Sequence, residues 1–153
     1  MDLGAVCAEV HALIGRLPHL RHPDDVEFEN GLYFFYEHAE RSAHAPDGRI
    51  VRIGNHPRSQ NRLKDRLWDH YSANKNFSVF RKFLGGALLR RADPRHPCLQ
   101  PRPGKGHWEK QGAPPCPECE ILELRVTELL ERHFRFRCLA IEERIFRNDL
   151  EKN

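Results

Sequence analysis

The side chains of this chain that could perform chemistry are a tyrosine, two arginines, a histidine and a glutamate. Hydrolysis of a phosphodiester needs an activated water, positive charge at the developing phosphorane and stabilisation of the leaving oxygen. A phenol, guanidinium groups, an imidazole and a carboxylate suit these tasks. Tyr33, Arg52, Arg66, His70 and Glu151 are of the right types, although composition alone does not single them out. Arg66 and His70 are four residues apart, so on a helix they would share one face and could reach one phosphate.

Basic residues are concentrated between Arg52 and Arg91. This stretch holds ten lysines and arginines against two acidic residues, whereas the net charge of the whole chain is only +3. A local excess of positive charge attracts phosphates, so we expect nucleic-acid contacts here. A solvated basic surface would have the same composition and is the alternative interpretation. The residues predicted to contact nucleic acid are His56, Arg62, Lys64, Arg81 and Lys82.

The bulk properties of the chain exclude several classes of protein. A length of 153 residues predicts a single domain that can bury a core. The sequence contains no apolar run long enough for a transmembrane helix and no secretory signal pattern, so we expect no membrane association. Five cysteines without regular spacing favour a reducing cytoplasm over a disulfide framework. Cys7 and Cys138 lie in apolar patterns and are predicted to be buried.

Hydrophobic periodicity and turn signals predict the elements that must position the candidate residues. An amphipathic helix over 2–17 should pack through its apolar face. Two strands over 31–37 and 49–54 are joined by a polar linker that contains the turn signal Pro46-Asp47-Gly48.

Further helices and a third strand follow these two strands. A helix over 79–89 contains Gly85-Gly86, a pair that a close approach by another element would explain. Seven prolines between 92 and 119 predict a long surface insertion. The remaining predicted elements are a helix over 62–72, a helix over 120–133, a strand over 134–141 and a last helix from 143. Together they indicate an α+β fold, with a small three-stranded antiparallel sheet flanked by helices, in one domain over 1–153.

Two tripeptides and a helix resemble the GIY-YIG nuclease family, most closely bacterial members whose second motif reads Val-Arg-Ile-Gly. Gly31-Leu32-Tyr33 matches the first tripeptide, and Arg52-Ile53-Gly54 occupies the place of the second. Arg66 and His70 match the catalytic arginine and the histidine of the family helix. The stretch from Arg147 to Glu151 resembles the one that bears the family's metal-binding glutamate.

This resemblance implies a metal-dependent endonuclease, a hydrolase that cleaves DNA, with duplex DNA the expected partner. Glu151 would hold Mg²⁺ or Mn²⁺, since one carboxylate and retained waters suit a hard cation. The predicted last helix spans only about three turns, so it should depend on packing, and we expect the C-terminal part to be truncated.

Arg52 departs from the family pattern, which has a tyrosine at this position. A guanidinium essentially cannot give up its proton, but it binds phosphate through two hydrogen bonds. We therefore expect Tyr33, with His56 or His70, to activate the water and Arg52 to bind the phosphate. The alternative is a nucleic-acid-binding module that keeps the fold and has weakened catalysis.

Cys116 and Cys119 form a CxxC motif within the proline-rich insertion. Structural zinc needs four ligands, and Cys98, His96 and His107 could complete the set. Two reduced thiols in a loop are the alternative. The motif leaves open a third function, a zinc-stabilised domain that recruits a partner.

Overall fold

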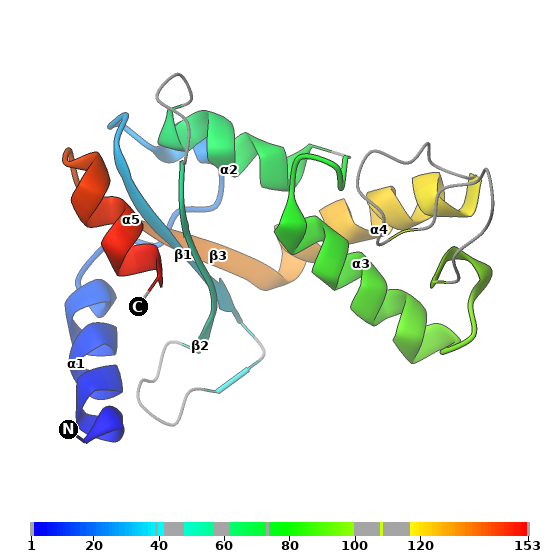
Figure 1. Ribbon diagram of the computed structural model, residues 1–153, viewed down its shortest axis with the longest axis horizontal. Coiled ribbons are helices and arrows are strands. Elements are labelled where there is room, and N and C mark those ends of the chain that lie inside the picture. Colours follow the sequence, from blue (N-terminus) through cyan, green and yellow to red (C-terminus); the bar gives the residue numbers. More distant parts are fainter. Residues whose placement is uncertain are drawn as a thin grey trace. The chain divides into compact units, whose positions relative to one another are not determined.

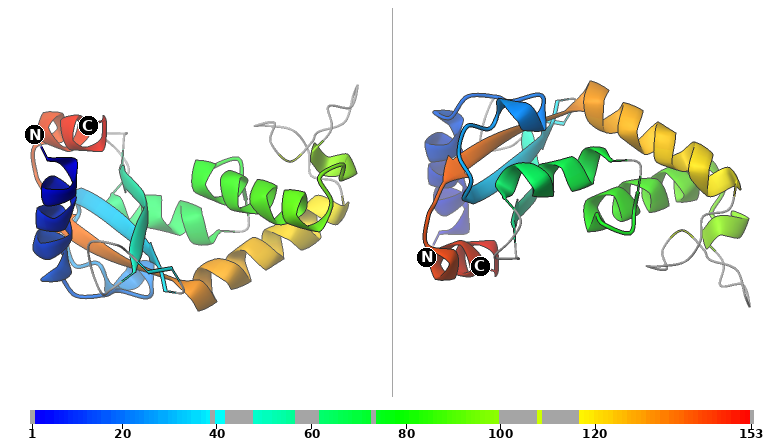
Figure 2. Two further views of the ribbon diagram at one scale, coloured as in Figure 1. Left: turned by 90° about the horizontal axis from the view of Figure 1, so that it is seen from below. Right: turned by 90° about the horizontal axis from the view of Figure 1, so that it is seen from above.

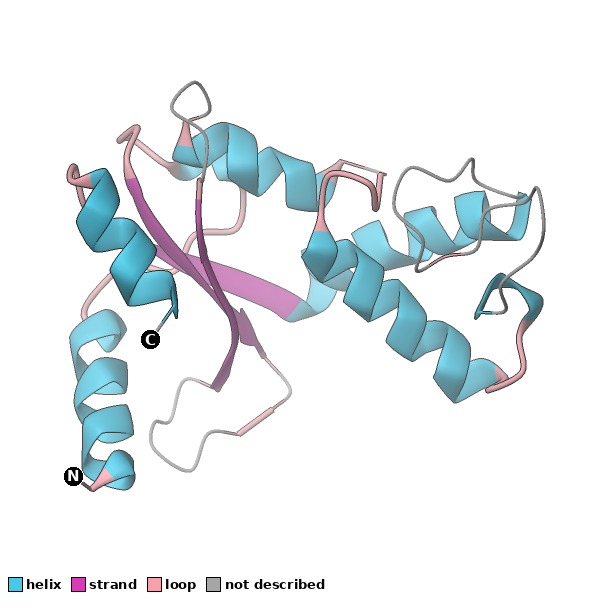
Figure 3. Cartoon of the chain, in the orientation of Figure 1, coloured by secondary structure: helices cyan, strands magenta, loops and turns pink. Residues whose placement is uncertain are grey.

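The structure, a computed structural model, describes residues 2–38, 40–41, 48–56, 62–72, 74–99, 108 and 117–152. Within them it has the predicted α+β fold with a three-stranded antiparallel sheet flanked by helices (Figure 1, Figure 3). The strands are β1 (Gly31–Glu37), β2 (Arg49–Asn55) and β3 (Phe134–Ala140). The α-helices are α1 (Leu3–Gly15), α2 (Leu63–Tyr71), α3 (Val79–Ala92), α4 (Pro117–His133) and α5 (Arg144–Lys152). Two 3₁₀ turns, η1 (Pro23–Asp25) and η2 (Pro97–Leu99), complete the described elements.

The chain divides into two compact units. Unit 1 comprises residues 1–68 and 131–153, and unit 2 comprises residues 69–130. The sheet, α1 and α5 belong to unit 1, whereas α3 and η2 belong to unit 2. Helices α2 and α4 each begin in one unit and end in the other. No described helix is long and apolar enough to cross a bilayer.

Strand β1 is the central strand of the sheet, and both neighbours pair with it in antiparallel fashion (Figure 1). Its sequence alternates between two faces, so Tyr33 and Phe35 point to one side while Phe34 and Tyr36 point to the other. Gly31 allows β3 to approach, because a Cβ atom there would lie 2.3 Å from the Leu139 carbonyl oxygen. The glycine of the first tripeptide is therefore required by strand packing.

The sheet face that carries Tyr36 is covered by α1, which lies beside the strands in both views of Figure 2. Ile14, near the end of α1, packs in a buried cluster with Leu32, Phe34 and Tyr36. The expected packing of this helix through its apolar face holds only in part, because Leu13 is 62% exposed. Val6, Val10 and Cys7 are also exposed, so only the C-terminal end of α1 reaches the core.

Unit 2 is built around contacts of α3. The indole of Trp108 lies against Gly85, where a Cβ atom would come within 2.1 Å of a ring carbon, and its Nε1 donates to the Lys82 carbonyl at 2.7 Å. This contact explains the first glycine of the pair and brings a buried residue of the predicted surface insertion into the core. Of the two phenylalanines of α3, Phe80 is buried and Phe83 is 64% exposed.

Candidate active site

Tyr33 and Gly54 form the centre of the candidate site. They are cross-strand partners, and a Cβ atom at Gly54 would lie 2.2 Å from the phenol oxygen of Tyr33. The phenol therefore lies directly over the glycine of the second tripeptide. Tyr33 is fully buried, and its ring makes an edge-to-face contact with Phe35 at 5.7 Å between centroids. The two tripeptides are thus joined by one side-chain contact.

Arg52 lies on the same sheet face as Tyr33, because the pairing of β2 with β1 is regular from Gly54 to Arg52, and it sits beside a β-bulge. It pairs with Phe35, but the next residue of β1, Tyr36, pairs with Ile50, so Val51 is the extra residue. Bulges redirect side chains and are common beside active sites. The Nε atom of Arg52 is buried and has no hydrogen-bond acceptor among the described residues. Leaving a buried donor in this state costs ~1–3 kcal/mol, so Nε has hydrogen-bonding capacity left for a ligand, while the guanidinium also hydrogen-bonds the Tyr33 phenol.

Arg66 is positioned by the packing of α2. Leu63 and Leu67, one turn apart, are completely buried and hold one face of the helix in the core. The backbone N–H of Leu63 donates to the Glu29 carbonyl at 2.8 Å, which ties the start of α2 to the segment before β1. On the other side, the Trp68 indole meets the His22 ring edge-to-face at 4.8 Å. These contacts fix the rotation of the helix and hence the direction of Arg66.

Glu151 is carried by α5, and two residues of this helix, Arg147 and Asn148, anchor it through hydrogen bonds. Arg147 donates through Nη1 to the carbonyls of Ile141 and Glu142, at 2.7 and 2.6 Å. Asn55, at the end of β2, donates from Nδ2 to Oδ1 of Asn148 at 3.0 Å. Glu151 is one turn beyond these residues on the same helical face. Its carboxylate is exposed at the rim of the site.

The electrostatics show that these side chains are neighbours. Burial raises the pKa of the Tyr33 phenol, the guanidinium groups of Arg66 and Arg52 oppose that shift, and the Glu151 carboxylate adds to it. The net effect is a raised pKa, so the phenol is protonated at neutral pH. Cys138, the cross-strand partner of Tyr33 on β3, is also kept neutral, because burial raises the pKa of its thiol to about 12.

His70 has its contacts within unit 2. Its ring is fully buried, its Nδ1 lies 2.7 Å from the Ser78 hydroxyl, and it meets the Phe80 ring edge-to-face. Ser78 is also the N-cap of α3, where its hydroxyl accepts from the Arg81 N–H. These are packing and capping contacts. Its predicted catalytic role stays a prediction.

The residues predicted to contact nucleic acid have different surroundings. Arg62 and Lys64 are in surface ion pairs, with Glu29 at 3.2 Å and Asp24 at 2.7 Å, and such pairs are weak enough to exchange for phosphate. His56 is buried directly after β2, and Lys82 is half-buried on α3.

Arg81 is buried, although the sequence predicted that it would contact nucleic acid at the surface. It has no exposed area, and its guanidinium is bonded to Glu123 and to the His70 carbonyl. The reason is that α3 turns this residue toward α4, so the basic stretch of the sequence is not one continuous surface.

The predicted zinc set is not assembled in the described residues. Cys116 and His107 lie outside them, and Cys98 and Cys119 are buried. No group of three or more His, Cys, Asp or Glu side chains that could hold a metal occurs in the described part of the chain. Structural zinc therefore stays a prediction.

Asn55 and Asn148 are the site residues that sequence reasoning missed. Their hydrogen bond fixes the helix that carries Glu151 against the strand that carries Arg52. A signal was available, because Asn55 directly follows the second tripeptide and Asn148 precedes Glu151 by three residues, on one helical face.

Comparison with known families identifies the chain. The family model described as the GIY-YIG domain matches residues 8–149, which is most of the chain, so the protein belongs to the GIY-YIG family. Members of this family are usually nucleases, hydrolases that act on nucleic acids. No curated protein and no solved structure gives a match to the chain.

Proposed function

We propose that the protein is a divalent-metal-dependent endonuclease that hydrolyses phosphodiester bonds in DNA. The observation that carries this proposal is the surroundings of the Tyr33 phenol, whose pKa responds to Arg66, Arg52 and Glu151 together. Two guanidinium groups, a phenol and a carboxylate at one end of a sheet are what in-line attack on a phosphodiester requires.

The donor set at Glu151 fits a hard cation with retained waters. An exposed carboxylate on a helix that is fixed by Arg147 and Asn148 supplies one oxygen ligand. Mg²⁺ is commonly bound through one or two carboxylates together with substrate phosphates. When bound, Mg²⁺ or Mn²⁺ would supply Lewis-acid charge to the phosphate oxygens.

The residues of the chain itself perform the remaining tasks. Arg66 and Arg52 would bind the phosphate and stabilise the charge that develops on it. The protonated phenol of Tyr33 would orient the attacking water by a hydrogen bond rather than act as a base. Because Tyr33 is fully buried, we infer that the arginine side chains move onto the phosphate when substrate binds and uncover the hydroxyl.

A plasmid-nicking assay with Mg²⁺ or Mn²⁺ tests the enzyme. Arg66→Ala and Glu151→Gln should each lower the rate by about 10²–10³-fold, because each removes a group that stabilises the transition state. Arg125→Ala is the control, since Arg125 is an exposed arginine of α4 that is not part of the candidate site, and its rate should stay within a few-fold of the parent. Equal cleavage by the parent, Arg66→Ala and Glu151→Gln would refute the proposal.

Arg52 favours a second candidate, a nucleic-acid-binding module with weakened catalysis. It occupies the tyrosine position of the family motif and supplies a phosphate-binding group there. Under this alternative the parent binds DNA without cutting it, and Arg52→Tyr gains cleavage. Under the enzyme proposal, Arg52→Tyr changes both DNA affinity and rate. An Arg52→Tyr variant with the parent's affinity and the parent's rate would contradict the assigned role of this residue.

A further inference from the structure

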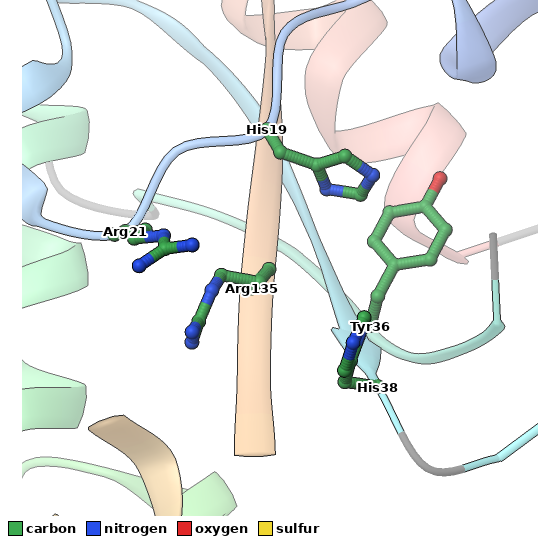
Figure 4. Close-up of a pocket in the computed structure, with 5 residues that line it drawn as sticks. All are labelled: His19, Arg21, Tyr36, His38 and Arg135. Atoms are coloured by element: carbon green, nitrogen blue, oxygen red, sulfur yellow. The ribbon is translucent and has the colours of Figure 1, made fainter. Parts of the chain in front are cut away.

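A second cluster of cationic and aromatic side chains lies on the opposite face of the sheet from Tyr33. It lines a cavity of about 190 Å³ within unit 1 (Figure 4). His19 and Arg21 come from the segment after α1, Tyr36 and His38 from the end of β1, and Arg135 from β3. Tyr33 and Tyr36 are three residues apart on one strand, so their side chains point to opposite faces. This cavity is therefore separate from the candidate active site.

The cavity carries positive charge that its neighbours leave largely uncompensated. Among the described residues, no carboxylate forms an ion pair with Arg21 or Arg135. Arg135 donates through Nη1 to the Glu131 and Phe134 carbonyls, at 3.0 and 2.6 Å. Its Nε and Nη2 donors have no acceptor in the part of the chain that the structure describes. The Asp25 carboxylate accepts the backbone N–H of Arg21.

A buried arginine, Arg137, contacts two of the residues that line the cavity and adds to this positive charge. Arg137 donates to the Ile14 carbonyl at 2.8 Å, and its Nη2 lies 2.6 Å from Nε2 of His19. Its guanidinium is 5.4 Å from the centre of the Tyr36 ring. The cavity wall formed by His19 and Tyr36 is thus backed by a third positive group.

We propose that this cavity binds a phosphate group. The planar forks of Arg21 and Arg135 match phosphate geometry, and the imidazole of His38 can add a further donor. Pockets for drug-sized ligands measure roughly 300–1,000 Å³. A cavity of about 190 Å³ is smaller, so it suits a phosphate with part of its ester group against the Tyr36 ring. The phosphate could belong to a nucleic-acid strand or to a small phosphate ester.

Binding is measured on the full chain in EDTA, at constant ionic strength, so that no cleavage is involved. Inorganic phosphate is titrated by calorimetry against the parent, Arg21→Ala, Arg135→Ala and the double variant. Each single variant should bind at least about tenfold more weakly, because a charge-assisted hydrogen-bond pair is lost. Arg21→Lys should lie between the parent and Arg21→Ala, since it keeps the charge but loses the fork.

Two controls separate this site from the proposed nuclease site. Arg66→Ala should bind phosphate at the cavity as the parent does, even where it abolishes DNA cleavage. Arg144→Ala removes an exposed arginine of α5 outside the cavity and should also have no effect. Equal phosphate affinity in the parent and the Arg21→Ala/Arg135→Ala double variant, or no phosphate binding by the parent, would overturn the inference. Neither result would contradict the proposed DNA cleavage, because cleavage is assigned to the separate site around Tyr33.

Further titrations identify the source of the phosphate. A 5′-phosphorylated oligonucleotide that binds at least tenfold more tightly than its 5′-hydroxyl counterpart, with the difference lost in the double variant, assigns the cavity to the end of a strand. A nucleoside monophosphate that binds more tightly than both oligonucleotides assigns it to a small ester. Both results support phosphate recognition, whereas identical binding of all three ligands to parent and double variant contradicts it.

Discussion

Arginine is buried in both compact units, but the two units use it differently. In unit 2, Arg81 donates from Nε and Nη2 to the Glu123 carboxylate, at 3.0 and 2.8 Å, and from Nη1 to the His70 carbonyl at 2.9 Å. In unit 1, the buried Nε of Arg52 has no acceptor among the described residues. The first arginine is compensated within the fold, whereas the second has hydrogen-bonding capacity left for a ligand.

The surroundings of the two arginines explain this difference. Burial lowers the pKa of Arg81, and Glu123 offsets this only in part. The ion pair between Arg81 and Glu123 joins α3 and α4. The Glu123 carboxylate also accepts the Lys75 backbone N–H at 2.6 Å. Around Tyr33, by contrast, Arg66 and Arg52 face a phenol that stays neutral. A buried basic residue therefore indicates function only when the fold does not already use its donors.

The largest expected effect is on the stability of unit 2. Arg81→Ala leaves the Glu123 carboxylate buried without its cation, which should cost ~3–5 kcal/mol in the free energy of unfolding. Urea denaturation monitored by circular dichroism measures this loss.

Arg52→Ala is the matched variant for this comparison. It removes a poorly satisfied buried donor, so we expect stability to change by less than about 1 kcal/mol while DNA affinity falls. A large loss of stability in Arg52→Ala together with a small one in Arg81→Ala would reverse the assignment of the two arginines.

The second comparison uses one glycine from each unit. Gly54→Ala forces the phenol of Tyr33 to move and should lower the cleavage rate by about 10²-fold, because small displacements of reacting groups are costly. Gly85→Ala pushes on the Trp108 indole and should cost ~1–3 kcal/mol in stability through overpacking, with little effect on the chemical step. Cleavage rates at a fixed folded fraction, with unfolding curves, distinguish the two. If Gly54→Ala and Gly85→Ala lowered the cleavage rate equally, the two glycines could not be assigned to catalysis and to stability, respectively.

The smallest expected effect concerns alkaline pH. The pKa of Tyr33 in the folded chain is raised above its unfolded value of about 10. The neutral phenol thus stabilises the fold fully below that pH, and this contribution is lost as pH rises through the folded pKa. The parent should lose stability more steeply above pH 10 than Tyr33→Phe does. Parallel profiles of stability against pH for the parent and Tyr33→Phe would show that the pKa of the phenol is not raised by folding.

The sequence predicted the sheet better than the helices that cover it. The strand over 31–37 was predicted with its observed bounds and the second to within one residue, because β-branched and aromatic residues flanked by turn signals are a local property. The prediction that α1 packs through its apolar face was only partly correct, because the exposure of its side chains depends on how far the helix lies over the sheet. Both Cys138 and Cys7 were predicted to be buried. Cys138 is buried, but Cys7 is exposed, because it lies on the part of α1 that does not reach the core.

The sequence alone therefore determined the family, the order of the elements and the types of side chain available at Tyr33, Arg52, Arg66 and Glu151. Tertiary structure decided which of them meet. The register of β2 against β1 places Arg52 on the sheet face of Tyr33, and the hydrogen bond between Asn55 and Asn148 brings the helix of Glu151 to the same place. It also decided that Arg81 is structural and that a separate cationic cavity forms behind the sheet. The physical reason is that charge compensation depends on partners distant in sequence, which no local pattern specifies.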